Sequence, residues 1–423
     1  MNFSPLLALA GLGTIGLLAT RLPRLQWPHT PSLELVLAAG APLVLAGLVL
    51  GPGIDLLTRP VLDALAPVTA LAIGWIGAAL GARFEWRHVQ RIPRATWLLA
   101  GLSATAAFAA VLLGAWLLAR AVPALSGAWT PRLPAILTLA AVAAASGPGA
   151  VALVARVVGV RHRMVRLLAR TATLQTAYGA LAASIPLALY HPDPLLSWTV
   201  WGIGGGALTG LVFLSLTRLN PEQTGTGFAL LASLLFGAGI AYAAGVSPFI
   251  VGALATALIV HGSPQRHVVR QVLWQWERPV AAILLIVAGA LLAVPTPWIL
   301  VAVPLLMALR AGAAWAAIRA GRRLPVEGVA QFPPHIGLGT MAQGVAAVAL
   351  GLSFLMVFGG RGAGVLTTIV LSVATAQIAA PALMKRALGA TPAGPAAPAV
   401  PEPLTRAGAA PEVSVNAPAE LTR

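Results

Sequence analysis

Apolar residues recur along the chain in runs of about membrane-crossing length, and short basic or proline-rich connections separate these runs. A helix needs roughly 20 apolar residues to cross the hydrocarbon core of a bilayer, so the pattern predicts an all-α membrane protein with about 13 transmembrane helices. The predicted spans are residues 4–20, 33–50, 66–82, 96–119, 133–157, 166–190, 196–216, 226–243, 247–262, 279–294, 297–317, 335–357 and 363–384.

Positive charges are concentrated in every second connection. Connections after odd-numbered spans hold 20 Lys or Arg residues, with Arg310 counted among them, and connections after even-numbered spans hold 4. Membrane proteins concentrate Lys and Arg on their cytoplasmic side. We therefore expect the N-terminus outside and the C-terminus in the cytoplasm. The first run has no basic residues before it, so we interpret it as an uncleaved span and not as a secretory signal.

The composition supports a membrane-embedded chain. Of the 423 residues, 58% are hydrophobic and only 9% are charged, whereas a soluble domain has roughly 25% charged residues. The chain has no Cys, which excludes disulfides and thiolate-bound metal clusters. Its formal net charge of +16 comes without a polybasic run, so we expect no nucleic-acid partner.

The last part of the chain changes in composition. Residues 387–423 are rich in Ala and Pro, with scattered Glu and Thr, and such a segment cannot bury a core. We expect a transmembrane domain over residues 1–386, followed by a disordered cytoplasmic tail over 387–423.

Ionisable groups inside a bilayer are costly to bury and are candidates for function. None of the eleven carboxylates falls near the middle of a predicted span. Arg170 is the cation that we place well inside a span, about one turn from Gln175. Arg170 either reaches the cytoplasmic interface along its apolar stem or is a fixed charge facing the interior. Gln175 either hydrogen-bonds to a neighbouring helix or is an ion ligand.

Two predicted spans contain helix breakers near their centres. The fifth has Ser146-Gly147-Pro148-Gly149, and the twelfth has Gly337, Gly339 and Gly344 around Met341-Ala342-Gln343. Interrupted helices in corresponding halves of a chain are typical of transporter binding sites, although Gly and Pro also serve helix packing in membranes. We predict broken helices in spans 5 and 12.

Several of these stretches resemble one family. Residues 43–52, LVLAGLVLGP, are similar to the second-helix signature "LAGxxLGP" of the monovalent cation:proton antiporter superfamily, which includes bacterial sodium/proton exchangers and potassium-efflux antiporters. Residues 73–80 resemble "FLIGLELD" without its acids, 145–151 stand where members have a broken "TSP" or "TDP" motif, 247–254 resemble "SPALGAFLAG", and 341–346 resemble "xxRGEVA". Arg310 falls where the eleventh helix of members often has a basic residue.

The resemblance covers most of residues 1–386 and implies an inverted-repeat antiporter fold. It also implies exchange of sodium or potassium against protons, a homodimer, and location in a bacterial inner membrane. Its implied partners are the lipid bilayer, a monovalent cation and the proton.

The site departs from the family pattern. Members carry a pair ending in Asp on the sixth helix, and this pair aligns with Gln175-Thr176 here. A Thr hydroxyl cannot exchange a proton near neutral pH, so the usual competition between cation and proton lacks its carboxylate. In the twelfth-span motif the basic residue has become Gln343 and the acid Val345.

The candidate ion-site residues are Gln175, Thr176, Ser146, Pro148, Gln343 and Arg170. Neutral oxygens can coordinate a dehydrated cation, whereas Arg170 facing a cavity would favour an anion. Three functions stay open. They are a cation:proton antiporter-type transporter with a divergent site, a same-fold transporter of an anion or neutral solute without proton coupling, and a transport-inactive membrane sensor or interaction protein. We expect no enzyme, cofactor or metal centre, because the seven His residues lie in connections or at span ends.

Overall fold

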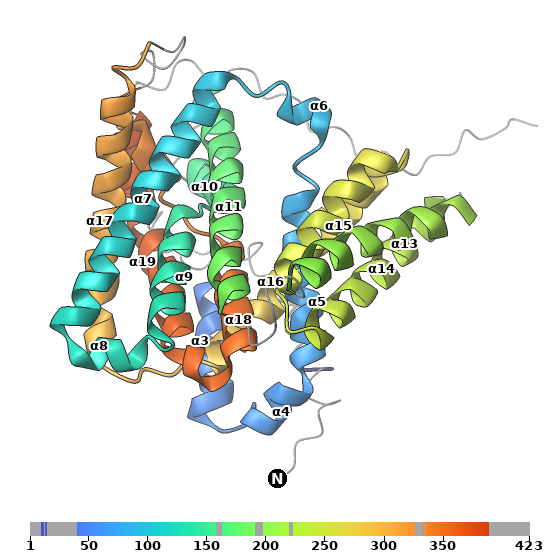
Figure 1. The fold of residues 1–423 in the computed structure, drawn as a ribbon, viewed down its shortest axis with the longest axis horizontal. Helices are drawn as coiled ribbons and strands as arrows, with labels where there is room; N and C mark the ends of the chain where they lie inside the picture. Colours follow the sequence, from blue (N-terminus) through green and yellow to red (C-terminus); the bar gives the residue numbers. More distant parts are fainter. Residues whose placement is uncertain are drawn as a thin grey trace, which may run out of the picture. The chain divides into compact units, whose positions relative to one another are not determined.

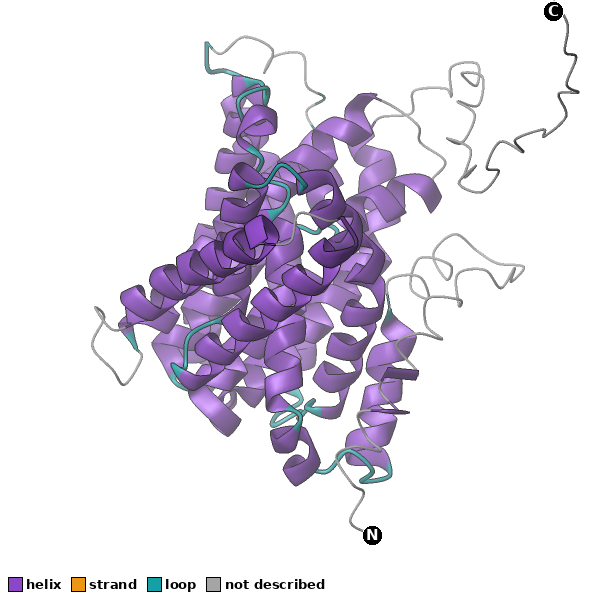
Figure 2. Ribbon diagram, turned by 90° about the vertical axis from the view of Figure 1, so that its right-hand side faces the viewer, coloured by secondary structure: helices purple, strands orange, loops and turns teal. Residues whose placement is uncertain are grey.

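Helices occupy the apolar runs in this computed structural model (Figure 1), which describes residues 10, 11, 13, 14, 40–157, 163–190, 198–219, 223–325, 333 and 335–388. Across these ranges there is no β-strand (Figure 2). The main helices are α3 (Ala41–Leu48), α4 (Arg59–Ala64), α5 (Ala66–Gly81), α6 (Trp86–Val89), α7 (Arg94–Ala121), α8 (Pro123–Ala128), α9 (Arg132–Ala144), α10 (Pro148–Val157), α11 (Arg163–Leu189), α13 (Gly205–Leu219), α14 (Gln223–Ala243), α15 (Pro248–Gly262), α16 (Arg266–Ala290), α17 (Trp298–Gly321), α18 (Val345–Phe358) and α19 (Ala363–Leu388).

Four short non-α segments interrupt or extend these helices. Two are π-helical, η2 (Val49–Gly53) and η3 (Val200–Gly204), and two are 3₁₀ helices, η4 (Ile336–Thr340) and η5 (Gly359–Gly362). Pro52 lies inside η2, where its missing N–H prevents a regular α-helical ladder.

Six helical stretches of the described residues are long and apolar enough to cross a membrane, or seven if the bent pair α9–α10 counts as one span. The chain is thus an all-helical, multi-pass membrane protein. Each predicted span from the second to the thirteenth overlaps a helix. The number thirteen remains a prediction, because the first span lies mostly outside the described residues and α3, α5 and α15 are shorter apolar helices.

One boundary differs clearly from the prediction. We expected a span to begin at residue 279, but α16 begins at Arg266 and contains Pro279 in its interior. Arg266 and Arg270, in its first turns, form ion pairs with Glu85 at 3.5 Å and 2.8 Å between N and O. These contacts hold a polar helical extension that the apolar run does not include.

The helices form two bundles joined through α18. In the first, α7 packs against α9, α11 and α17, and α19 packs against α17, α18 and η4. In the second, α5 packs against α14, α15 and α16, and α13 packs against α14 and α15. Figure 1 shows α7, α9, α11 and α17 side by side, with α13, α14 and α15 in a separate group. Helix α18 contacts both α5 and α16 of the second bundle.

Close backbone contacts explain two of the stretches that resemble the antiporter signatures. Gly47, in the LAGLVLGP stretch, lies so near α16 that a Cβ there would overlap the Ile286 carbonyl. Gly252, in the SPFIVGAL stretch, has the same relation to the Gly74 carbonyl of α5. Small residues allow membrane helices to approach closely, so these stretches act in helix packing.

Helix α19 is the last helix of the described residues. The chain divides into two units between Gly389 and Ala390. Helix α19 continues to Leu388, two residues beyond the expected boundary at 386. The rest of the predicted tail lies outside the described residues.

Candidate functional site

Two helices are interrupted in the first bundle. Helix α9 ends at Ala144, residues 145–147 are not helical, and α10 begins at Pro148 with its axis bent by 43°. Pro148 takes the first helical position, where its missing N–H costs nothing. In the second interruption, η4 ends at Thr340, residues 341–344 are not helical, and α18 begins at Val345.

The two interruptions, residues 145–147 and 341–344, cross in direct contact, and we call this region the crossing. The backbone N–H of Gly147 donates to the Ala342 carbonyl at 2.9 Å, and the Ser146 hydroxyl donates to the Thr340 carbonyl at 2.6 Å. A Cβ on Gly147 would lie 2.5 Å from the Gly344 nitrogen, so this approach requires glycine. Unwound backbone from two distant parts of the chain therefore satisfies its hydrogen bonds mutually, as membrane-embedded backbone must.

Arg310 of α17 donates hydrogen bonds to both interruptions. One guanidinium nitrogen donates to the Met341 carbonyl at 2.9 Å, and the other donates to the Ala145 carbonyl at 3.0 Å and the Ser146 hydroxyl at 3.2 Å. The residue is 1% exposed. The carbonyl end of a helix carries a partial negative charge, so the ends of α9 and η4 stabilise this cation in place of a carboxylate.

Helix α11 also contacts the crossing. The Thr176 hydroxyl contacts the Ser146 carbonyl and also lies 2.7 Å from the Ala172 carbonyl, one turn earlier on its own helix. The Gln175 amide points elsewhere, because its nitrogen donates to the Ser103 hydroxyl of α7 at 2.6 Å. Thr176 thus belongs to the crossing, and Gln175 links α11 to α7.

Two glutamine side chains form hydrogen bonds at the second interruption. The Gln343 side-chain nitrogen donates to the Val142 carbonyl of α9 at 3.0 Å. The Gln377 side-chain nitrogen, on α19, donates to the Gln343 backbone carbonyl. The side-chain oxygens of Gln175, Gln343 and Gln377 are buried, and within the described ranges they have no hydrogen-bond partner.

The structure thus brings together Ser146, Thr176 and Gln343 of the predicted candidates, with Pro148 at the start of α10.

Arg170 is exposed on α11, whereas Arg310, which we counted in a connection, is the cation buried inside a helix. The charge count after odd-numbered spans therefore falls to 19 against 4. Sequence reasoning also missed Gln377. The signal for Arg310 was available, since it interrupts an apolar run over residues 297–317.

Carboxylates of the described residues lie away from the crossing. Glu85 is paired with Arg266 and Arg270, and Glu277 lies 3.8 Å from Arg83. The other two, Asp55 and Asp63, line a cavity of about 900 Å³. In the described part of the chain, no group of three or more His, Asp or Glu side chains is placed to hold a metal ion.

The crossing is closed in this conformation. Ser146, Gln175 and Thr176 are each 3% exposed or less. The large cavity lies between α5, α16 and the C-terminal part of α18, where Leu352 and Met356 line it. None of the crossing residues lines this cavity.

The chain shares its fold with a solved transporter. It is similar to the structure of the sodium proton antiporter MjNhaP1 from Methanocaldococcus jannaschii, with 14% sequence identity and a TM-score of 0.60 over 91% of this chain and 99% of that one. No protein-family model and no curated protein matches the sequence. The fold therefore defines the class: a multi-pass membrane protein with the architecture of a sodium/proton antiporter.

Proposed function

We propose that this chain is an integral-membrane transporter of the cation:proton antiporter type, moving sodium or potassium against protons through a divergent ion site. The observation that carries the proposal is the crossing of two interrupted helices around Arg310, within a fold that is similar to a sodium proton antiporter over 91% of the chain. Unwound segments at membrane depth supply ligands for small ions in transporters.

The chemistry of the proposed site is that of neutral oxygens. Ser146, Thr176 and Gln343 offer hydroxyl, amide and backbone oxygens, and no carboxylate of the described residues contacts them. A cation bound there lacks a counter-charge, so we expect low affinity. Proton coupling then requires a titrating group other than the carboxylate that family members use.

The large cavity supports a cation as substrate. Its lining includes two carboxylates, Asp55 and Asp63, and one cation, Arg59. The charged side chains of the lining therefore have a net negative charge, which raises the local concentration of cations. In our proposed topology, the helix ends that form this cavity face outside.

The proposed membrane arrangement has thirteen spans in an inverted repeat, with an outer N-terminus and a cytoplasmic C-terminus. The bias of 19 basic residues against 4 supports this orientation. Following the family resemblance, we propose a homodimer in a bacterial inner membrane, with a transmembrane domain to about residue 386 and a disordered tail.

A transport-inactive membrane protein is the second candidate. The observation that favours it is the burial of Ser146, Gln175 and Thr176 at 3% exposure or less, away from the lining of the large cavity. An anion transporter based on Arg170 has less support, because this side chain is exposed on α11.

Proton flux in reconstituted proteoliposomes separates these functions. An imposed pH gradient is followed while sodium, potassium or lithium is added, for the native chain and for Thr176→Asp. The matched control is Thr173→Asp, on the same helix, whose hydroxyl donates to Ala169 and does not touch the crossing. Native flux that depends on the cation supports the proposal. Flux with Thr176→Asp alone would overturn it and identify a competent scaffold whose native site is inactive.

A further inference from the structure

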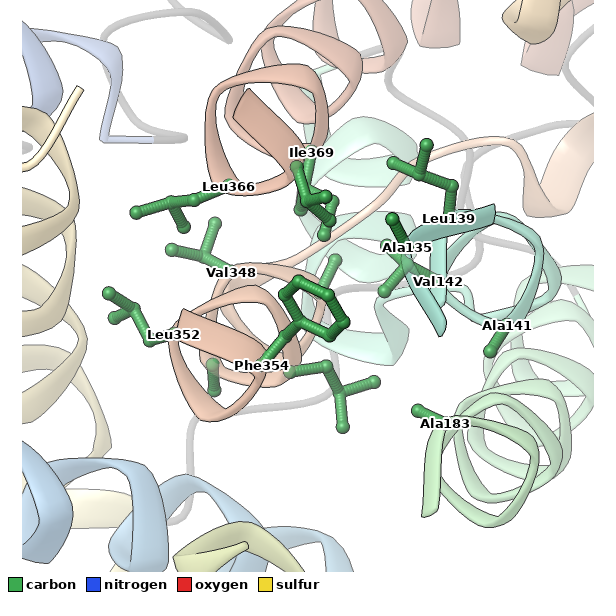
Figure 3. Packing of buried hydrophobic residues seen from close by; sticks show 14 of the residues in the cluster. Ala135, Leu139, Ala141, Val142, Ala183, Val348, Leu352, Phe354, Leu366 and Ile369 are labelled. Atoms are coloured by element: carbon green, nitrogen blue, oxygen red, sulfur yellow. The ribbon is translucent and has the colours of Figure 1, made fainter. Parts of the chain in front are cut away.

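A small cavity with three polar side chains in a mostly apolar lining adjoins the crossing on the side of α19. It has a volume of about 20 Å³ and is enclosed by α7, α9, α17, α19 and Gln343. Three side chains that line it are polar, namely Gln343, Thr368 and Ser372, and the others are apolar. Figure 3 shows Leu139 and Val142 of α9 near Ile369 of α19, all of which line this cavity. Its volume suits a single guest the size of a water molecule.

Gln343 presents an oxygen that has no partner. Its side-chain nitrogen donates to the Val142 carbonyl at 3.0 Å. A carbonyl accepts and cannot donate, so this contact identifies the nitrogen and leaves Oε1 as the free atom. Gln343 is 1% exposed, and its Oε1 has no hydrogen-bond partner in the part of the chain that the structure describes. An amide oxygen buried in this way costs free energy unless something binds to it.

The hydroxyl oxygens of Thr368 and Ser372, which line the cavity, also have lone pairs that can accept a hydrogen bond. Thr368 donates its single hydrogen to the Gly364 carbonyl at 2.8 Å and accepts from the Trp129 indole at 2.9 Å. Ser372 donates its hydrogen to the Thr368 carbonyl at 2.8 Å. Since a hydroxyl has one hydrogen and two lone pairs, both groups offer only acceptor oxygens to a guest. The three polar groups of the cavity are therefore matched to a cation or a hydrogen-bond donor, and they repel an anion.

We propose that this cavity binds a dehydrated monovalent cation through Gln343 Oε1 and the hydroxyls of Thr368 and Ser372. The inference rests on the proposed cation transport and adds a binding position beside the crossing, which shares Gln343 with the proposed site. A divalent ion is disfavoured, since it is usually bound by carboxylates, and the cavity has none. Because Gln343 belongs to the interruption that Arg310 holds, an ion bound to it acts directly on the crossing.

The test is thermal unfolding of the purified full-length chain in detergent, in chloride salts of lithium, sodium, potassium or choline at equal ionic strength. A ligand that binds only the folded state raises the unfolding temperature by mass action. We compare the native chain with Ser372→Ala and Gln343→Leu. The matched control is Thr375→Ala, also on α19, whose hydroxyl donates to Leu371 and does not line the cavity.

We expect at least one small cation, but not choline, to stabilise the native chain and Thr375→Ala equally. Ser372→Ala should need about tenfold more of that cation for the same stabilisation, because one ligand oxygen is lost. Gln343→Leu should show no specific response. If Gln343→Leu does not fold, the Ser372→Ala comparison alone decides. No difference between the cations and choline in the native chain overturns the proposal and identifies the guest as water. An unchanged response of Ser372→Ala overturns the assigned location.

This experiment measures binding, so its outcome is separate from that of the flux assay. Cation-dependent proton flux without the expected loss in Ser372→Ala overturns the cavity site alone. A specific cation response that Ser372→Ala weakens, in a chain without flux, supports the cavity site and overturns the transport proposal.

Discussion

The molecule neutralises arginine side chains in two different ways. In the crossing, Arg310 is 1% exposed and contacts only carbonyl and hydroxyl oxygens. Where α16 begins, Arg266 and Arg270 instead pair with Glu85, and all three side chains retain some exposure. At the start of α16, a carboxylate with a full negative charge thus neutralises the arginines. In the crossing, the partial negative charges of two helix ends stabilise Arg310 instead.

This difference shows how the chain accommodates a buried arginine that no carboxylate of the described residues contacts. Backbone carbonyls at the ends of α9 and η4 take over the role of counter-ion. Arg310 is thus a structural part of the crossing, and the proposed function requires that neutral oxygens bind the ion.

Replacing Arg310 should have the largest effect. Arg310→Leu leaves the Ala145 and Met341 carbonyls buried without a donor, and we expect a loss of about 3 kcal/mol or more in the free energy of unfolding. Arg310→Lys should recover only part of this, because an ammonium does not match the planar fork of donors. Thermal unfolding in detergent is the measurement, with exposed Arg319→Leu on the same helix as control. Equal stability of Arg310→Leu and Arg319→Leu would contradict the structural role.

Adding a methyl group to the crossing should have the next largest effect. In Gly147→Ala, the new Cβ would lie 2.5 Å from the Gly344 nitrogen, and separating the two backbones should cost about 1–3 kcal/mol. Gly149→Ala is the matched control, because no atom lies within 4 Å of the added Cβ. We expect this control to be neutral or slightly stabilising, since alanine favours a helix. Similar unfolding temperatures for the two variants would show that the interruptions are not in close contact.

The carboxylate region should be less sensitive. Glu85→Gln removes two ion pairs from a carboxylate whose side chain is 7% exposed, while its Arg partners remain partly solvated. We expect a loss of about 1–2 kcal/mol that shrinks at high salt. Chemical or thermal unfolding at two salt concentrations measures it. A loss that does not depend on salt would mean that packing, and not charge, accounts for the contribution of Glu85 at α16.

The smallest effect is expected at Glu277. Its contact with Arg83 is long, at 3.8 Å, and both side chains are more than 20% exposed. Glu277→Gln should therefore change the free energy of unfolding by about 0.5 kcal/mol or less. A larger loss than that of Glu85→Gln in the same unfolding assay would reverse the ranking of the two pairs.

Sequence reasoning located the helices and their interruptions well, for a local reason. Apolar runs predict helices wherever they occur, and the clustered Gly and Pro residues at 147–149 and at 337, 339 and 344 lower the helix propensity locally. The apolar pattern failed at α16, because the helix continues into a polar stretch that ion pairs with Glu85 stabilise. Those pairs join residues about 180 positions apart, which no local pattern reveals.

The candidate site was less accessible to sequence reasoning. Arg170 and Arg310 each interrupt an apolar run, and only packing shows that the first is exposed and the second is 1% exposed. Gln377 carried no signal, because a glutamine near the end of a span is compatible with many roles. Its contact with Gln343 depends on how α19 lies against the second interruption.

The amino-acid sequence suffices to predict a helical membrane protein with two interrupted segments that themselves contain no carboxylate, since chain composition and local backbone preference decide those features. The tertiary structure alone decided that the two interruptions cross, that Arg310 is their common partner, and that Gln343, Thr368 and Ser372 meet at one small cavity. The physical reason is that a buried polar group must find its partner in space, and that partner here lies up to some 200 residues away along the chain.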